Sequence, residues 1–187
     1  MTFKKYEEIL KFWFEESSSK DHWTKNNNYD QKIRELFIDD VEKAIRNEYD
    51  DWQDEAKSSL ALVILLDQFS RNLFREDPKS YSQDTKARLL VTEGVDRQYL
   101  DELNVSERLF YLLPLVHSED LQDHNYVNQL GEVFLKESPN YENIKKSWND
   151  HMVVIKRFGR YPHRNKILNR ESTTEEIEFL KGPNSSW

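Results

Sequence analysis

The most continuous apolar stretch of the chain predicts a buried helix. Residues Leu60 to Leu66 are all apolar, and Phe69 and Leu73 continue the pattern at helical spacing. A helix that is apolar nearly all round is enclosed on every side, so we expect residues 58–75 to form the core. The second half of this stretch also carries four polar side chains, Asp67, Gln68, Arg71 and Asn72. Buried polar groups need hydrogen-bond partners, so these four mark a candidate ligand-binding site.

Apolar residues recur at helical spacing before and after this core and predict further helices. A dense apolar run over residues 109–116 contains Pro114, which we expect to kink or end a helix just before His117. The other expected helices cover residues 4–16, 29–45, 77–91, 119–136, 141–158 and 173–181.

Residues with known preferences for helix ends predict where several of these helices begin or stop. Ser58 or Ser59 is the expected N-cap of the central helix. The helix expected to begin at residue 77 should end near Gly94. Ser172 and Glu175 have the spacing of a capping box for the last helix.

The fold class that follows is all-α, in a single domain covering residues 1–187 with about seven or eight helices. No stretch alternates apolar and polar residues as a half-buried strand would. No internal repeat of fixed period is present, so the sequence alone does not predict a regular solenoid.

The amino-acid composition excludes several kinds of site and a membrane-spanning segment. Cysteine is absent, which excludes disulfides, thiolate nucleophiles and cysteine-ligated metal centres. No apolar run approaches the roughly 20 residues of a membrane span, and the first residues form no apolar signal core. We therefore expect a cytoplasmic protein with no membrane partner, and the composition does not determine its oligomeric state.

One segment departs from the acidic character of the chain. Residues 156–170 contain six lysines or arginines and no acid, although the formal net charge of the whole chain is −8. Guanidinium groups on a turn with Gly159 and Pro162 could hold a phosphate or a carboxylate in bidentate fashion. The alternative is that the arginines pair with acids of the chain itself. The candidate ligand-binding residues here are Arg157, Arg160, Arg164 and Asn165.

The expected partner is a small anionic ligand or an acidic peptide. The basic segment is short and the overall charge is negative, which argues against nucleic-acid binding. No phosphate-binding glycine loop is present among only four glycines, and no cofactor is identified.

Histidines and acids near the second apolar run are candidates for proton transfer. His117, Glu119 and His163 are the candidate catalytic residues, with histidine transferring protons and a carboxylate orienting it. His151 shares an apolar face with Trp148 and is expected in the core. A divalent metal could use imidazole and carboxylate groups, but no compact ligand motif is present, so no metal site is predicted.

Several motifs resemble, in order, those of the family called domain of unknown function nine-two-four. They are FWFEE, LALVILLDQFSRNLFR, LPLVHSEDLQDH, HMVVIKRFGRYPHRN and LNRESTTEEIEFL. The resemblance covers essentially the whole chain. It implies a tetratricopeptide-like fold, with antiparallel helical hairpins around a buried central helix, and it implies no established activity.

Two positions depart from the family pattern. Ser70 replaces a proline in the central motif, which should ease continuation of the helix. Asn169 replaces a glycine beside Arg170, which removes a permissive backbone position where a ligand could approach closely.

Three functions are compatible with these observations. The polar residues could converge on a small anionic molecule, with catalysis left open. They could instead clamp a carboxylate of a peptide in a helical-repeat groove. They could also form a purely structural network with no ligand.

Overall fold

The computed structural model describes residues 4–183, 185 and 186, and every regular element among them is helical. This confirms the all-α class. Two compact units divide the chain: an N-terminal unit made of residues up to Arg75 together with Lys79–Pro114, and a C-terminal unit made of Glu76–Pro78 and residues from Leu115 onward. The expected single domain stays a prediction. Within the described residues, no helix is both long enough and apolar enough to span a membrane.

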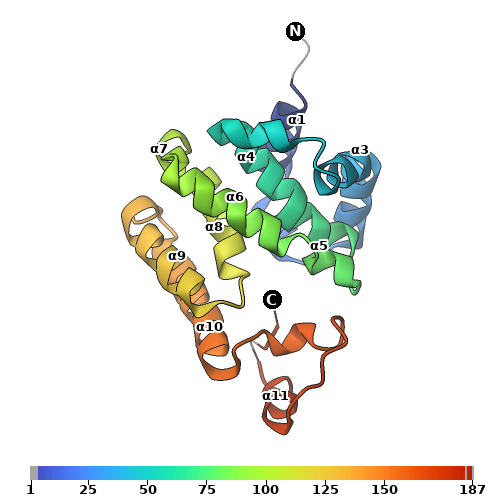
Figure 1. Ribbon diagram of the computed structural model, residues 1–187, viewed down its shortest axis with the longest axis vertical. Coiled ribbons are helices and arrows are strands. Elements are labelled where there is room, and N and C mark those ends of the chain that lie inside the picture. Colours follow the sequence, from blue (N-terminus) through green and yellow to red (C-terminus); the bar gives the residue numbers. More distant parts are fainter. Residues whose placement is uncertain (1–3, 184, 187) are drawn as a thin grey trace. The chain divides into compact units, whose positions relative to one another are not determined.

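Helices of the N-terminal unit surround one central rod (Figure 1). The rod consists of α4 (Ala56–Val63), a π-helical turn η3 (Ile64–Phe69) and α5 (Ser70–Leu73). Around it are α1 (Lys5–Lys11), η1 (Phe12–Glu16), α2 (Ser19–Trp23), α3 (Asn27–Ile45), η2 (Asp50–Asp54), η4 (Pro78–Tyr81), α6 (Asp84–Asp96), α7 (Tyr99–Glu102) and α8 (Val105–Val116).

The buried central helix predicted from the apolar run is confirmed. Every side chain from Leu60 to Leu66 has 0% exposure, and Phe69 is also fully buried. Phe69 packs against Phe12 and Trp13, both from the π-helical turn η1. Ser70 continues the helix from η3 into α5, as expected for a residue that keeps its backbone N–H.

Most helix ranges agree with the periodicity, with differences at short elements. Pro114 lies inside α8, which ends at Val116 as predicted. The helix expected over residues 77–91 is instead the short turn η4 followed by α6. The short helices α2 and α7 were not predicted, so the described residues contain more helical segments than the expected seven or eight.

The N-cap prediction for the central helix was wrong. The helix begins at Ala56, after Glu55. Ser58 Oγ donates instead to the carbonyl oxygen of Trp52 at 2.7 Å, and Ser59 Oγ pairs with the Tyr111 hydroxyl at 2.9 Å. Both serines therefore lie inside the helix and bind residues outside it.

Gly94 does not end a helix, which corrects the second boundary prediction. It lies inside α6, where a Cβ atom would stand 1.9 Å from the Tyr111 hydroxyl oxygen. That hydroxyl donates to the carbonyl oxygen of Leu90 at 3.1 Å. Glycine is needed here because only a missing side chain lets the tyrosine reach the helix backbone.

The capping box of the last helix is shifted by one residue. Thr173 is the N-cap of α11 (Thr174–Phe179), and Glu176 completes the box. Ser172 has a different function, since its hydroxyl accepts a hydrogen bond from Asn165 Nδ2 at 3.0 Å.

In the C-terminal unit, α9 (Leu121–Phe134) and α10 (Tyr141–Phe158) form a hairpin (Figure 1). A Cβ atom on Gly131 would lie 2.9 Å from the Trp148 ring, and Asn128 contacts Met152. Pairing positions therefore move backwards along α10 as they advance along α9, so the helices are antiparallel. Such a hairpin is what the family resemblance implied, while the tetratricopeptide-like superhelix stays a prediction.

After α10 the chain forms a turn that includes η5 (Pro162–Arg164) and leads to α11. The core beneath it combines Val154 and Ile155 of α10 with Tyr161, whose ring is fully enclosed. Gly159 ends α10 in the left-handed conformation, with φ +66°. This turn carries four of the candidate site residues, Arg160, His163, Arg164 and Asn165.

Candidate functional site

The predicted ligand-binding residues fall into two groups, one in each compact unit. Those of the central rod belong to the N-terminal unit, and those of the basic segment belong to the C-terminal unit together with residues 117–119.

The four polar residues of the central rod contact acids of their own unit. Arg71 pairs with Asp67 at 2.9 Å and with Asp84 at 3.0 Å. Asp67 is fully buried and accepts a hydrogen bond from Gln68 Nε2 at 2.5 Å. Asn72 donates to Asp30 at 2.7 Å. Their geometry ties the rod to α3 and α6, since Asp30 and Asp84 are on those helices.

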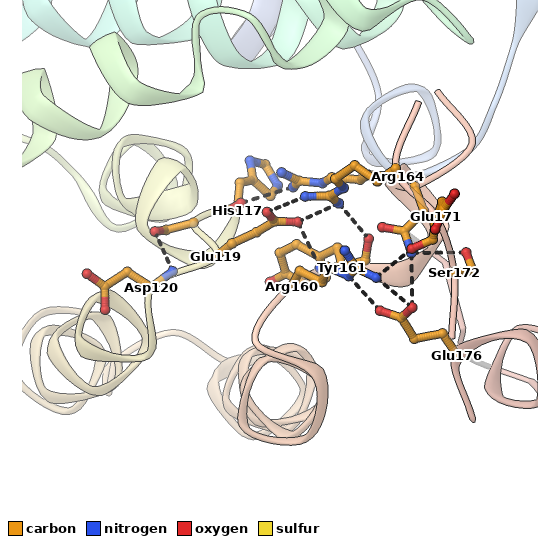
Figure 2. Close-up of polar contacts among 12 residues, drawn as sticks. His117, Glu119, Asp120, Arg160, Tyr161, Arg164, Glu171, Ser172 and Glu176 are labelled. Atoms are coloured by element: carbon orange, nitrogen blue, oxygen red, sulfur yellow. Dashed lines mark hydrogen bonds and ion pairs between the residues drawn. The ribbon is translucent and has the colours of Figure 1, made fainter. Parts of the chain in front are cut away.

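The polar group of the C-terminal unit is shown in Figure 2. Its residues come from the loop 117–120 between α8 and α9, from the turn 159–173 and from the first turn of α11. Two carboxylates, Glu119 and Glu176, are the centres of this group, and each is gripped by a different arginine.

Glu119 is bound by three hydrogen-bond donors. Arg170 donates through Nη1 to Oε2 at 2.7 Å and through Nη2 to Oε1 at 3.0 Å, and the Tyr161 backbone N–H donates to Oε1 at 2.8 Å. Both side chains are partly exposed, 28% for Glu119 and 24% for Arg170. Burial would raise the pKa of the Glu119 carboxyl, but these hydrogen bonds and the nearby charge of Arg164 hold that pKa below its usual range.

Glu176 is bound by a second, buried set of donors. Arg160 grips both carboxylate oxygens, at 2.6 Å and 2.8 Å. The backbone N–H of Thr173 donates at 2.7 Å, and Asn165 Nδ2 donates at 3.3 Å. The Arg160 hydrogen bonds lower the pKa of Glu176 to about 2, against the opposing effect of burial. Glu176 is 2% exposed and Arg160 is 28% exposed, so the pair joins an enclosed carboxylate to a guanidinium near the surface.

Arg164 and His117 are brought together by the turn. The buried Arg164 lies over the Tyr161 ring, 4.5 Å from its centroid, and its Nη2 donates to the His117 carbonyl oxygen at 3.0 Å. The loop 117–120 is thus held by its backbone at His117 and by its side chain at Glu119. Glu119 contacts Arg170 and Tyr161, rather than orienting a histidine as the proton-transfer interpretation requires.

Two buried histidines lie beside the same tyrosine. His124 Nε2 donates to the Ser118 carbonyl oxygen at 2.8 Å, and His151 Nδ1 donates to the Ser147 carbonyl oxygen at 2.7 Å. Burial lowers the pKa of His124, and it lowers the pKa of His151 to about 4. His151 is therefore a neutral core residue, as its apolar helix face predicted.

The remaining predicted residues lie at the edge of the group. Arg157 forms an exposed pair with Glu175 at 2.8 Å. The His163 ring is 5.5 Å from the Tyr161 ring. Among the residues that the structure describes, no three or more histidine or acidic side chains are grouped as a metal would require.

Arg170 and Glu176 were not identified from the sequence as site residues. Asn169, which precedes Arg170, takes the left-handed conformation with φ +53°, which asparagine adopts more easily than most residues. No local signal identifies Glu176 as the partner of Arg160.

Comparison with known proteins agrees with the fold. A family model described as bacterial protein of unknown function (DUF924) matches residues 9–184. A solved structure, that of the protein of unknown function ATU0120 from Agrobacterium tumefaciens, has 34% sequence identity and a TM-score of 0.86, and the match covers 95% of this chain and 97% of that chain. No curated protein matches this chain.

Proposed function

The chain belongs to the DUF924 family, whose description names no activity, and from the geometry we propose that it binds a small anionic molecule where the Glu119 carboxylate lies. The receptor for that anion is the Arg170 clamp, defined here as the Arg170 guanidinium and the Tyr161 backbone N–H. A carboxylate or a phosphate group on the ligand would replace the side chain that occupies the clamp.

The observation that supports this proposal is a complete carboxylate receptor on a partly exposed surface. Two guanidinium nitrogens and one backbone N–H converge on the Glu119 carboxylate at 2.7–3.0 Å. Charge-assisted bidentate contacts of this kind are the usual recognition of carboxylate and phosphate by arginine. The donors stay in place whether the bound oxygens belong to Glu119 or to a ligand.

Glu119 is well placed to leave the clamp. It lies in the loop 117–120, just before Asp120, the N-cap of α9, so its side chain can rotate without unwinding a helix. An exposed ion pair contributes ~0–1 kcal/mol, whereas breaking a buried one costs ~3–5 kcal/mol. With about a quarter of each side chain exposed, the Glu119–Arg170 pair is closer to the first class.

The matching test uses the thermal stability of the purified protein in the presence of acetate or phosphate. A ligand at about 100 times its dissociation constant adds ~2.7 kcal/mol, which raises the melting temperature by roughly 5–10 °C for a chain of this size. We expect the wild type to be stabilised and Glu119→Gln to bind the anion about tenfold more tightly, because the tethered competitor is weakened.

Two variants complete the design. Arg170→Gln should lose the anion response, whereas Arg157→Gln, which alters an exposed pair in the same unit, should keep it. If Glu119→Gln binds the anion no better than wild type, the clamp is not the site.

A structural network is the second candidate function, favoured by the enclosed Glu176 carboxylate and its pair with Arg160. Its four donor contacts to one carboxylate link the turn to α11. Under this alternative, Arg160→Ala and Arg170→Ala would both destabilise the C-terminal unit and no anion would bind. Catalysis by His117, Glu119 and His163 stays a prediction, and the lowered pKa of Glu119 disfavours it as a proton donor.

A further inference from the structure

We infer that the anion bound by the Arg170 clamp carries a phosphate group in its dianionic form, in preference to a singly charged carboxylate. This inference rests on the proposed function and identifies the chemical class of its ligand. It follows from the number of positive groups around the Glu119 carboxylate and from the donors that this carboxylate leaves unused.

Arg170 and Arg164 contribute positive charge at the clamp, and the charge of the nearby Arg160 is largely offset by its partner Glu176. Arg170 contacts Glu119 directly. Arg164 reaches the carbonyl oxygen of His117, two residues before Glu119, and Arg160 directly precedes Tyr161, whose N–H is part of the clamp. The charge of Arg164 adds to the hydrogen bonds from Arg170 and Tyr161 that hold the pKa of the Glu119 carboxyl below its usual range. A group with two negative charges gains more from such a field than a group with one.

The number of available donors also exceeds what a carboxylate can use. Arginine has five N–H groups, and Glu119 takes one from Nη1 and one from Nη2, while Nη2 also donates to the Tyr161 carbonyl oxygen at 3.2 Å. The Nε of Arg170 is buried and has no acceptor among the described residues. A phosphate group presents three terminal oxygens in a tetrahedral arrangement, so it offers one more acceptor than a carboxylate.

Figure 2 shows how these groups surround Glu119. Dashed contacts reach its carboxylate from the turn, and the labelled Arg160, Tyr161 and Arg164 all come from the same short segment after α10. This segment supplies one of the three donors to Glu119, the Tyr161 N–H, and Arg170 supplies the other two. The rigid Pro162 and the buried Tyr161 ring fix this segment before any ligand arrives.

The test compares anions of different charge on the full chain by isothermal titration. Acetate carries one negative charge and sulfate carries two throughout the range from pH 5.5 to pH 7.5. Methyl phosphate changes from mostly one charge to two because its second pKa is ~6. We expect sulfate to bind at least tenfold more tightly than acetate, and methyl phosphate to gain several-fold in affinity from pH 5.5 to pH 7.5.

Sulfate controls for titration of the protein itself, since its own charge does not change over this range. Arg170→Gln controls for the general stabilising effect of sulfate on folded proteins, which the variant should retain. Comparing methyl phosphate with inorganic phosphate shows whether the ligand is a monoester or the free ion: equal affinities would favour recognition of the phosphate group alone.

The possible results separate the two claims. If acetate binds as tightly as sulfate in an Arg170-dependent way, the dianion inference is wrong and the proposed anion site stands. If methyl phosphate shows the same affinity at both pH values while sulfate binds, the preference is for shape and the charge argument is wrong. If no anion binds in an Arg170-dependent way, both the inference and the proposed function are overturned.

Discussion

In the N-terminal unit, every side chain from Leu60 to Leu66 is apolar and fully withdrawn from solvent, whereas the C-terminal unit places the charged Glu176 at nearly the same depth. Apolar burial stabilises the first region without regard to ionisation. The second depends on Glu176 remaining charged and on Arg160 remaining beside it. Two all-helical units of one chain therefore differ in what conditions they tolerate.

The C-terminal unit itself contains two carboxylate–arginine pairs that differ in the exposure of the carboxylate. Glu176 and Glu119 are both gripped by a guanidinium in the same unit, but the first is 2% exposed and the second 28%. Under the proposed function, exchange with a carboxylate from solution should therefore cost less at Glu119 than at Glu176. Burial of the carboxylate, more than contact geometry, is the difference between the two pairs.

The largest expected effect comes from Arg160→Ala. Removing the guanidinium leaves the enclosed Glu176 carboxylate without its main partner, so the loss of unfolding free energy should be several times that of an exposed pair, which is ~0–1 kcal/mol. Urea denaturation followed by circular dichroism measures this loss. Arg157→Ala is the matched control and should change stability by less than ~1 kcal/mol, because its pair with Glu175 is exposed. Equal effects of the two variants would remove the distinction between buried and exposed pairs.

A cavity in the apolar core of the N-terminal unit should also lower the free energy of unfolding substantially, but by an amount that does not depend on pH. Leu65→Ala deletes a fully buried side chain and should cost ~2–5 kcal/mol. The loss should be the same at pH 5 and pH 7, since no ionisable group is removed. A loss that changes markedly with pH would show that the core of the N-terminal unit depends on charge as well.

Acid should weaken the C-terminal unit through His151. Its pKa is about 4 in the folded protein and ~6.5 when unfolded, so the unfolded state binds the proton more tightly. The contribution of neutral His151 to the free energy of unfolding is fully present above pH 6.5. It is lost as the pH falls towards 4, and the loss is at most about 3 kcal/mol. Proton NMR titration of the His151 ring measures the pKa directly.

The pH dependence of unfolding provides the corresponding stability measurement. In His151→Gln, the free energy of unfolding should change less with pH between pH 6.5 and pH 4 than it does in the wild type. A further loss should begin below the ordinary pKa of a glutamate, ~4.3, and continue towards pH 2 as Glu176 is protonated. An unfolding free energy that is constant from pH 7 to pH 4 would contradict the burial argument for His151.

The smallest effect is expected for Glu119→Gln without added anion. The variant keeps the shape of the side chain and loses one charge of a partly exposed pair, so stability should fall by no more than ~1 kcal/mol. Glu176→Gln, the same change at the buried pair, should cost several times as much. A Glu119 effect as large as the Glu176 effect would make the clamp structural.

The sequence was a good guide to regular helices and a poor guide to short ones. The long helix α10 follows directly from its apolar face, and the buried central rod follows from a run that is apolar all round. The π-helical turn η3 and the short helices α2 and α7 leave no periodic signal, because each spans less than two turns. Gly94 was misread because its purpose is contact with Tyr111, a residue of another helix.

For the candidate site too, the sequence predicted some features and not others. Its residue types and the basic segment were evident from the sequence, and so was the alternative that arginines pair with acids of the chain. The partners were not, because Glu119 and Arg170 are 51 positions apart and Arg160 and Glu176 are 16 apart. No local periodicity relates residues at such separations.

By itself, then, the sequence determined the all-α class, the buried rod and the concentration of arginines after α10, because these depend on local periodicity and composition. The tertiary structure alone decided that Arg160 holds an enclosed carboxylate and that Arg170 holds a carboxylate accessible to solvent. That decision depends on the path of the turn over the enclosed Tyr161 ring, which sets the depth at which each carboxylate meets its arginine.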